Sequence, residues 1–442
     1  MTWRGTAPHA VVIGAGFCGL TAAHELVKRG LKVTVLEGDL QIGGLAGSFA
    51  VGGTRIEKFY HHWFTSDRYI VDLIQELEAG DQIVLRPTRT GMFYANRMFR
   101  LASPLDLLRF QPLPVIDRIR LGLLTMRARR IRDWKELEKL SAARWLREMS
   151  GRKVYEIVWE PLLRGKFGGY AEDISAVWFW NKLKLRGGSR SKGGGEQLAY
   201  YQGGFAALAD KLAASIRAHG GEIRTDAAVT RLVTSEMQCV GVVVDSELVP
   251  ADIVIATPAL PVVADLVAPH VPREYVSGLR RIKYLANVCL VLQLDRSLSE
   301  TYWLNVNDPE FPFIGVIEHT NFEPPETYGG RHIVYLSKYL PETESYFRMS
   351  DEEVLNYTLP HLKRMFPAFL REWVRDFHVW RARYAQPIVE CNYREMIPSC
   401  LTPLHGLYLA SMAQIYPEDR GTNYAVREGR RVAARIVEEI TE

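Results

Sequence analysis

The chain has 442 residues, of which 47% are hydrophobic and 24% are charged, the balance of an ordinary soluble globular protein. Its length exceeds what one hydrophobic core usually holds, so we expect two domains. The formal net charge of +4 is mild and does not favour a nucleic-acid partner, and no zinc-finger spacing or sequence repeat supports one.

Cysteine usage and the first residues favour a reducing, cytoplasmic location. The five cysteines are odd in number, widely spaced and never form a CxxC pair, so we predict neither a disulfide framework nor a bound metal. The first ten residues, MTWRGTAPHA, lack the apolar core of a signal peptide, and no run of about 18 apolar residues could cross a bilayer.

Residues 9–36 have the order strand, helix, strand. Residues 11–13 are apolar and end at a glycine, residues 17–29 repeat apolar side chains at helical spacing, and residues 32–36 form a second apolar run. In the turn, Gly14 permits a tight bend, Gly16 lets the backbone approach a pyrophosphate, and Gly19 lets helix and strand pack closely. Because a helix N-terminus also offers free N–H groups to phosphate, we predict a dinucleotide site here.

An acidic residue and a second glycine pair narrow the choice of dinucleotide. Glu37 ends the second strand, 18 residues after Gly19, where a carboxylate can accept hydrogen bonds from both ribose hydroxyls. It would also repel a 2′-phosphate, so NADP is not expected. Gly43 and Gly44 follow, an arrangement similar to that of flavoproteins of the glutathione-reductase type, and they favour FAD over NAD.

The chain closes with another strand, a polar loop and an amphipathic helix. Residues 407–410 are predicted to be the strand, and the helix begins near Thr422. Such a unit can aim a helix N-terminus at the flavin pyrimidine and stabilise negative charge there.

Three blocks of sequence together resemble one superfamily. They are the opening stretch, the segment YYQGGFAALADKLAASIRAHGGEIRTDAAVTRL from Tyr200, and the closing unit. The blocks are similar to those of the flavin amine oxidases, protoporphyrinogen oxidases and phytoene desaturases, which have UDP-galactopyranose mutase as a relative. The resemblance implies an α/β fold, in which a Rossmann-like FAD-binding domain is built from discontinuous segments and carries an inserted substrate domain of antiparallel sheet and helices.

The same resemblance implies domain bounds. Residues 1–58, 196–270 and 396–442 would form the FAD-binding domain. Residues 59–195 would form a mostly helical cap or substrate subdomain, and residues 271–395 the sheet and helix of the substrate domain. Within these bounds the glycine-rich stretch RGGSRSKGGGEQ, residues 186–197, predicts a linker back into the FAD domain or a mobile lid.

The resemblance also assigns sixteen residues to FAD. They are Gly14, Ala15, Gly16, Gly19, Glu37, Gly43, Gly44, Leu45, Val229, Thr257, Ser411, Met412, Gly421, Thr422, Asn423 and Tyr424. Two positions depart from many relatives: Leu45 stands in place of an arginine, and Ser411-Met412 in place of Gly-Asp. The carboxylate expected on the ribityl chain is therefore missing, and that contact must come from Ser411, from backbone or from another residue.

The segment from Arg97 to Lys153 contains fifteen Arg or Lys and six Asp or Glu. One interpretation is a solvated helical face. The other is a surface for an anionic substrate or for lipid headgroups, since helical insertions in the resembled superfamily often cover the substrate and some touch membranes.

Residues 57–67, EKFYHHWFTSD, supply the first catalytic candidates. The resemblance places this region over the flavin, so Lys58, Tyr60, His61 and His62 are candidates for contact with flavin or substrate. One of the two histidines is expected to be structural. Without a carboxylate or cysteine at ligand spacing, the pair does not indicate a metal site.

Two further candidates lie later in the chain. Glu318 beside His319 is either a tuned acid–base pair or a satisfied pair in the core. Arg420, before the last helix, either meets a negatively charged substrate or flavin phosphate or forms ion pairs at a helix end.

Substrate contacts are predicted from two regions. Arg164 and Lys166, in WEPLLRGKFGG, hold an anionic group or pair with nearby carboxylates. Polar side chains around the predicted antiparallel sheet are the other candidates: Tyr302, Asn305, His319, Asn321 and Tyr335.

The sequence supports one principal function and two alternatives. The first is an FAD-dependent oxidoreductase that transfers hydride between flavin N5 and a small or lipid-like organic substrate. One form of this prediction gives the substrate an anionic group. No second GxGxxG follows, so oxygen, a quinone or another acceptor is expected rather than a built-in nicotinamide site. The alternatives are a redox-neutral sugar-nucleotide mutase or epimerase that uses reduced flavin, with Arg164, Lys166 and Arg420 on phosphates, and a flavin-holding scaffold at a membrane.

Overall fold

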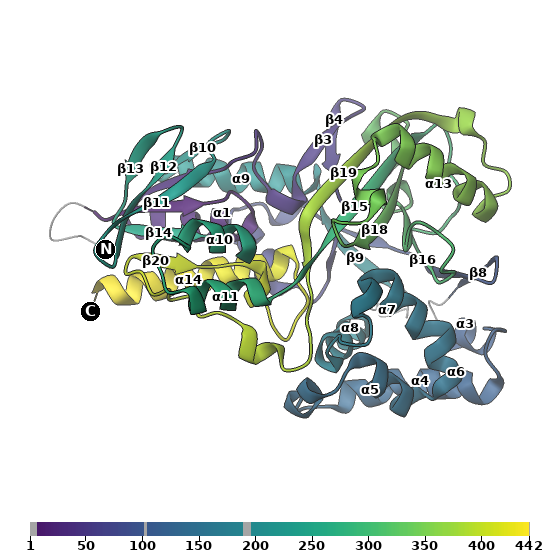
Figure 1. Cartoon of the computed structure of the whole chain (residues 1–442). Coiled ribbons are helices and arrows are strands. Elements are labelled where there is room, and N and C mark those ends of the chain that lie inside the picture. Colours follow the sequence, from purple (N-terminus) through teal and green to yellow (C-terminus); the bar gives the residue numbers. More distant parts are fainter. Residues whose placement is uncertain (1–6, 101–103, 189–195, 442) are drawn as a thin grey trace.

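The computed structural model describes residues 7–100, 104–188 and 196–441. In the view of Figure 1 a parallel sheet with its helices occupies the left half, and a long antiparallel sheet occupies the right half above a group of helices. This arrangement is the mixed α/β fold that the sequence predicts. None of the described helices combines the length and the hydropathy needed to cross a bilayer.

The parallel sheet has five strands in the order β10-β2-β1-β14-β20, and every neighbouring pair is parallel. The strands are β1 (His9–Ile13), β2 (Lys32–Leu36), β10 (Glu222–Arg224), β14 (Ile253–Ala256) and β20 (Leu407–Leu409). The N-terminal strand therefore lies between β2 and a strand more than two hundred residues away, so distant segments build this sheet, as predicted from the sequence.

Alternate residues of the parallel strands pack on opposite faces of the sheet. Val12 and Ile255 face a cluster formed with α1 (Phe17–Val27), α9 (Gly204–Ala218) and α14 (Thr422–Thr441). Val11 and Val254 face the other cluster, formed with the hairpins and helices of the opposite layer. Those elements are β11 (Val229–Ser235), β12 (Gln238–Val244), β13 (Glu247–Pro250), α10 (Leu260–Val267) and α11 (Arg273–Arg281). Each buried Val or Ile contributes about 1.5–3 kcal/mol to stability, so both layers fix the sheet.

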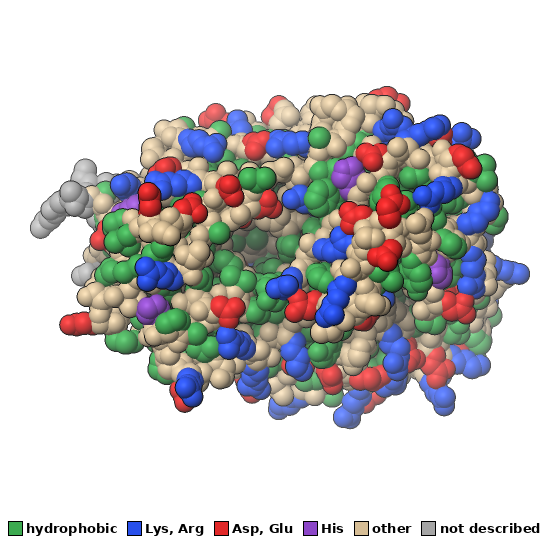
Figure 2. Space-filling view, turned by 45° about the horizontal axis from the view of Figure 1, so that its top comes forward, with side chains coloured by type: hydrophobic (Ala, Val, Ile, Leu, Met, Phe, Trp, Pro, Cys, Tyr) green, Lys and Arg blue, Asp and Glu red, His purple; other side chains and the backbone are tan. Residues whose placement is uncertain are grey.

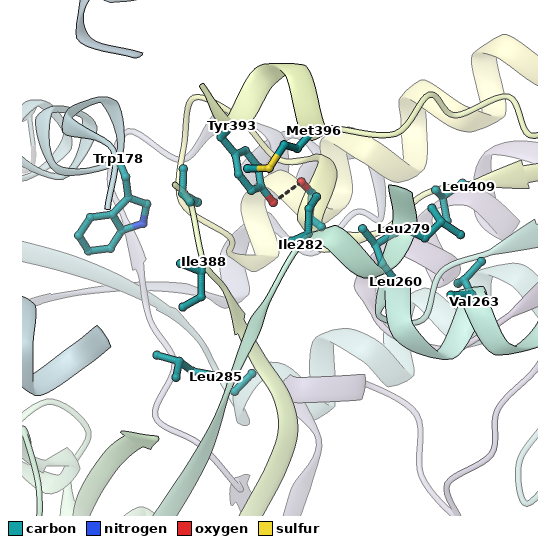
Figure 3. Close-up of a cluster of buried hydrophobic side chains, with 14 of the residues drawn as sticks. Trp178, Leu260, Val263, Leu279, Ile282, Leu285, Ile388, Tyr393, Met396 and Leu409 are labelled. Atoms are coloured by element: carbon teal, nitrogen blue, oxygen red, sulfur yellow. Dashed lines mark hydrogen bonds between the residues drawn. The ribbon is translucent and has the colours of Figure 1, made fainter. Parts of the chain in front are cut away.

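The second cluster also connects the two halves of the molecule (Figure 3). Leu260 and Leu409 lie at the parallel sheet, while Leu285 and Ile388 continue the cluster at the long strands that lead to the antiparallel sheet. The Tyr393 hydroxyl donates a hydrogen bond to the Ala413 carbonyl, 2.9 Å away, within this cluster. The two halves thus share a continuous core rather than a flexible linker.

The antiparallel sheet has the order β19-β15-β18-β17-β16-β7-β8. Its strands are β7 (Thr90–Tyr94), β8 (Arg97–Arg100), β15 (Tyr284–Leu294), β16 (Trp303–Val306), β17 (Gly315–Glu318), β18 (His332–Leu340) and β19 (Val374–Pro387). The pairing of β16 with β7 is parallel. Residues 59–195 are therefore not wholly helical: the buried run Gly91, Met92 and Phe93 extends the substrate sheet instead of joining the helices.

Helices from the same segment form a subdomain below this sheet in Figure 1. They are α3 (Pro104–Leu108), α4 (Val115–Arg130), α5 (Ala142–Ser150), α6 (Arg152–Val154), α7 (Glu160–Phe167) and α8 (Ala176–Gly188), with a π-helical turn at Tyr155–Trp159. The Ser141 side chain caps α5 by accepting from the Arg144 N–H, and the buried Trp180 indole of α8 donates to the Ala128 carbonyl of α4. These contacts, with α7 packed against β18, place a rigid helical layer over the sheet.

Eight α-helices and β-strands remain among the described residues. They are β3 (Ser48–Val51), β4 (Thr54–Glu57), β5 (Trp63–Phe64), β6 (Ile83–Pro87), β9 (Gln197–Tyr201), α2 (Arg68–Glu76), α12 (Ser345–Arg348) and α13 (Asp351–Met365). Residues 189–195, in the centre of the glycine-rich stretch, lie outside the described residues, so the choice between linker and lid stays a prediction.

Glu57, at the end of β4, connects this strand to β9, to α9 and to the antiparallel sheet. Its buried carboxylate accepts hydrogen bonds from the Tyr200 hydroxyl at 2.7 Å and from the Phe205 N–H at 2.6 Å. Its carbonyl accepts from the Tyr335 hydroxyl of β18 at 2.7 Å. Burial raises the pKa of Glu57 to about 7, although these hydrogen bonds oppose the shift.

We predict a pH signature for Glu57. Between its ordinary pKa of 4.5 and about 7, the folded protein holds a proton that the unfolded chain releases, so the free energy of unfolding falls as pH rises through this window. Glu57→Gln removes that titration and should flatten the fall. Urea unfolding of wild type and variant at several pH values checks this, and parallel profiles for the two proteins would contradict it.

The crossing of α1 and α14 yields a second prediction. A Cβ on Gly429 of α14 would lie 2.5 Å from the Cys18 carbonyl oxygen, so Gly429→Ala should lower the free energy of unfolding by about 1–3 kcal/mol. Gly278 of α11 has nothing within 4 Å of the added atom, and Gly278→Ala should instead stabilise the protein by up to about 1 kcal/mol. Denaturant titration of both variants measures the contrast, which an unaltered Gly429→Ala protein would refute.

Candidate active site

The turn between β1 and α1 leaves no room for a side chain at its first and third glycines. Gly14 has φ +100°, and a Cβ there would lie 2.6 Å from the Thr257 hydroxyl oxygen. A Cβ on Gly19 would lie 2.0 Å from the Gly14 carbonyl oxygen. The Thr257 hydroxyl, just after β14, donates to the Ile13 carbonyl at 2.7 Å and closes the turn from the other strand. The first and third glycines thus have the roles predicted from their spacing.

Glu37 and the second glycine pair are held against this turn. One Glu37 carboxylate oxygen accepts from the Ala15 N–H at 2.6 Å, and the Gly43 N–H donates to the Ala15 carbonyl at 2.8 Å. A Cβ on Gly44 would lie 3.1 Å from the Gly16 Cα. Two glycine backbones therefore face each other at the N-terminus of α1, with a half-buried carboxylate beside them. This backbone-walled crevice fits a pyrophosphate, and the carboxylate fits its ribose.

Val229 and the C-terminal residues extend the same region. The Ala227 N–H donates to the Glu37 carbonyl at 2.8 Å, which joins the segment just before β11, whose first residue is Val229, to the end of β2. Ser411 and Met412 follow β20, where the Ser411 N–H donates to the Gln414 side chain at 2.7 Å. These are the positions at which the sequence departs from its relatives.

A cavity of about 360 Å³ lies between the helical subdomain, the antiparallel sheet and the segment before α14. Eleven of the residues that line it are Phe, Tyr or Trp, and Leu45 of the glycine-pair loop reaches it. The aromatic side chains include Tyr60, Trp159, Trp178, Tyr302, Trp303 and Tyr424. Gly421, Thr422 and Asn423 line it as well, so the predicted flavin end of the FAD site and the cavity share residues. The Asn423 side-chain oxygen accepts from the Ile70 N–H at 3.1 Å and thereby ties α2 to α14.

The histidine stretch reaches the cavity. His61 donates from Nδ1 to the Phe59 carbonyl at 2.6 Å, and burial lowers the pKa of His61 to about 4, so the ring is neutral at neutral pH. His62 Nδ1 lies 2.9 Å from the Tyr302 hydroxyl. Both histidines and Tyr60 line the cavity, whereas Lys58 does not.

Lys58 contacts an acidic and an aromatic side chain outside the cavity instead. Its Nζ is 3.6 Å from the Asp39 carboxylate and 4.9 Å from the centre of the Trp380 ring. An ion pair and a cation–π contact account for its position.

Two lysines pair with one buried carboxylate in the cavity wall, and an arginine lies next to it in the chain. The Asp419 carboxylate lies 2.6 Å from Lys182 Nζ and 3.6 Å from Lys166 Nζ, and neighbouring Arg420 donates to the Tyr339 hydroxyl at 2.8 Å. Two further carboxylates, Asp67 and Glu196, line the cavity elsewhere, so its formal charges balance as a whole. Around Asp419, however, this cation cluster (Lys166, Lys182, Arg420) leaves a local excess of positive charge.

The pKa values within the cation cluster reflect burial and crowding. Burial lowers the pKa of Lys166 to about 7, with Lys182 and Arg420 acting in the same direction and Asp419 opposing them. Burial alone would raise the pKa of Asp419, but the nearby cations hold it well below its usual range. Lys166 therefore gains and loses its charge near neutral pH.

Glu318 and His319 lie outside the cavity. The Glu318 carboxylate accepts from the Ser297 hydroxyl and from the Leu298 and Ser299 N–H groups, within 2.5–2.9 Å. His319 Nε2 lies 2.7 Å from the Tyr328 hydroxyl. These contacts hold both side chains in the core with separate partners, although the buried His319 Nδ1 has none, and they favour structural roles over an acid–base pair.

Some of the other predicted substrate residues line the cavity and some do not. Asn321 donates to the Ser299 and Thr301 carbonyls, Tyr335 is bonded to the Glu57 backbone, and neither lines the cavity. Arg164 is 60% exposed and pairs with Glu160 along its own helix at 2.8 Å. Lys166, Tyr302 and Asn305 do line the cavity, the last accepting from the Trp303 indole at 2.9 Å.

Several cavity residues were missed by the sequence reasoning, Lys182 and Trp303 foremost. Lys182 and Trp178 are four residues apart on α8, so a basic and an aromatic side chain share one helix face, and this spacing is a signal that could have been found. Asp419, although next to Arg420, shows no signal in the sequence, because its role depends on lysines more than two hundred residues away.

Comparison with known proteins agrees with this geometry. The family model described as flavin containing amine oxidoreductase matches residues 17–437. The chain is 27% identical to the phytoene dehydrogenase of Streptomyces griseus over 319 residues, 62% of this chain and 59% of that protein. It is 30% identical to the putrescine oxidase of Kocuria rosea over 154 residues, 32% of this chain and 31% of that one. The match thus spans less than two thirds of either relative.

Solved structures share the fold over nearly the whole chain. An Exiguobacterium protein provisionally named protoporphyrinogen oxidase superposes with a TM-score of 0.78 at 17% identity, covering 98% of this chain and 100% of that one. A reduced UDP-galactopyranose mutase gives 0.75 at 14% identity, covering 99% and 95%. The resemblance predicted from the sequence is confirmed: the chain belongs to the flavin-containing amine oxidoreductase family, and its cofactor is FAD.

Proposed function

We propose that the protein is an FAD-dependent oxidoreductase that transfers hydride between flavin N5 and an organic substrate carrying an anionic group. The cation cluster carries this proposal, because its three basic side chains near Asp419 leave a local excess of positive charge in one part of the cavity wall. The family supports the oxidoreductase class but does not name the substrate.

The residues that would hold FAD are those of the crevice. The Gly14–Gly19 turn would hold the pyrophosphate, Glu37 the ribose, and the residues from Gly421 onward the flavin end. When bound, FAD supplies two-electron chemistry that no side chain of the protein can provide.

The cavity residues would bind, orient and protonate the substrate. Trp178 and Trp303 offer apolar faces that exclude water, and Arg420, which stays charged, would pair with the anionic group. Lys166 Nζ, with a pKa of about 7, can hold or release a proton at neutral pH. His61 has its Nδ1–H committed to the backbone, which assigns its Nε2 the acceptor role.

A second candidate function is a redox-neutral reaction on a sugar nucleotide that uses reduced flavin. The same cation cluster favours it, because Lys166, Lys182 and Arg420 also suit the charge of phosphates. Arg164 has no part in this version, since it points away from the cavity.

Anaerobic mixing distinguishes the two functions. The holoenzyme is mixed with panels of carboxylated amines, carboxylated alkenes and sugar nucleotides. Loss of the oxidised flavin spectrum supports the oxidoreductase, whereas turnover that requires prior reduction and leaves the spectrum unchanged supports the redox-neutral enzyme. A colourless protein that takes up no FAD would overturn both.

The FAD assignment predicts the effect of a change at Glu37. Glu37→Leu loses two charge-assisted hydrogen bonds to the ribose, and the FAD dissociation constant should rise by about 10- to 100-fold. Fluorescence titration of the apoprotein measures this, with the exposed Glu222→Gln on β10 as the control. Equal affinity in the wild type and in Glu37→Leu would refute the ribose contact.

The cation cluster predicts a charge effect with an internal control. Lys166→Met should weaken binding of benzoate, an aromatic carboxylate, by roughly tenfold at pH 6. Because Lys166 loses its charge as pH rises through about 7, wild-type affinity should fall across that range and the variant's affinity should not. Arg164→Met, two residues away and exposed, should behave like wild type. Perturbation of the flavin spectrum reports binding, and a pH-independent wild type would contradict the assignment.

A further inference from the structure

Helix α4 is apolar on two opposite faces. Its buried face packs into the helical subdomain through Leu121, Leu124 and Ala128. On the opposite side five large apolar side chains are exposed, by 38% to 66% of their surface: Val115, Ile116, Ile119, Leu123 and Met126. At 100° per residue these five fall within an arc of about 100°, a continuous stripe three turns long. A surface helix of a monomeric protein usually carries polar residues on this side.

Neighbouring elements widen the stripe. Leu105 and Leu108 of α3 and Met98 of β8 are also exposed, and α3 packs on both α4 and β8. We call these eight side chains the α4 apolar surface. Among the described residues, seventeen large hydrophobic side chains are exposed, and the α4 apolar surface holds eight of them within residues 98–126. Such clustering marks a site of interaction rather than chance exposure.

Arginines surround the α4 apolar surface. Residues 97–132 contain nine arginines, two aspartates and neither lysine nor glutamate. The two aspartates lie beside arginines, Asp106 at 3.7 Å from Arg100 and Asp117 at 3.0 Å from Arg120, so the local charge is strongly positive. On the face shown in Figure 2, by contrast, acidic and basic side chains are intermixed. The partner of this surface must therefore be both apolar and negatively charged.

We propose that the α4 apolar surface binds the surface of a lipid bilayer that contains anionic lipids. The apolar stripe would enter the boundary between headgroups and acyl chains, and the flanking arginines would meet lipid phosphates. A second copy of the chain fits less well, because a two-fold pairing would set the arginines of both copies face to face with few carboxylates between them.

The buried side of α4 connects this surface to the cavity. Phe110, Leu121 and Val158 form one cluster with Trp159, and Trp159 also lines the cavity. Only α4 and this cluster of side chains would therefore separate a bilayer on the outer side of α4 from a substrate in the cavity. The inference itself rests on the outer surface and does not depend on the redox activity.

Vesicle flotation of the holoenzyme tests the inference. We expect binding to vesicles of phosphatidylcholine with phosphatidylglycerol, much weaker binding to phosphatidylcholine alone, and a loss of binding as salt is raised. A protein that does not float with the anionic vesicles at low salt overturns the proposal.

A matched pair of variants assigns the binding to the α4 apolar surface. Ile116→Ser combined with Ile119→Ser and Leu123→Ser should lower the vesicle partition coefficient roughly tenfold or more, while FAD content and melting temperature stay as in wild type. Leu248→Ser with Leu370→Ser, at side chains 55% and 50% exposed elsewhere, should leave the partition unchanged. Equal partition of the triple variant and wild type refutes the proposal. So does a wild-type dimer that the triple variant dissociates, since the surface would then belong to a second copy.

Discussion

Two close backbone contacts of α1, each possible only because a glycine lacks a side chain, fix the position of this helix in the fold. At Gly19 the helix touches the turn that follows β1, and on its other side the Cys18 carbonyl leaves no room for a Cβ on Gly429 of α14. The first helix is thus clamped between the first strand and the last helix. Because α14 begins at the cavity, this clamp also sets where residues from Gly421 onward stand relative to the crevice at Gly14. The cofactor crevice and the substrate cavity are therefore parts of one rigid arrangement.

The crevice could be predicted from the sequence because the residues that form it are close together in the chain. Gly14, Gly19 and Glu37 lie within one strand-helix-strand unit, and each has a backbone reason for its position. The cavity could be predicted only in part, since a linear pattern does not show how a helix is rotated. Arg164 and Lys166 look equivalent in sequence, yet two residues on a helix point about 200° apart, so one reaches the cavity and the other reaches solvent. Polar residues in apolar strands, such as Glu318, carry the same ambiguity between core and site.

Burial explains the chemistry that the cavity offers. Burial lowers the pKa of Lys166 to about 7, so the side chain loses much of its preference for the charged form. Asp419 opposes this shift only in part, because its carboxylate also pairs with Lys182. An anionic substrate would stabilise the charged form of Lys166, so substrate recognition and the protonation state of Lys166 Nζ are coupled. The aromatic wall strengthens that coupling because it keeps the local dielectric low.

The strand order also governs how the protein is made. In the parallel sheet β14 pairs with β20, and β20 consists of residues 407–409, near the end of the chain. While the ribosome is still adding residues, the nascent sheet has an open edge that its own later sequence must close. The nucleotide-holding half, although it begins at the N-terminus, cannot mature ahead of the rest. Because residues 421–424 line the flavin end of the site, a complete flavin site likewise requires those residues to have been synthesised.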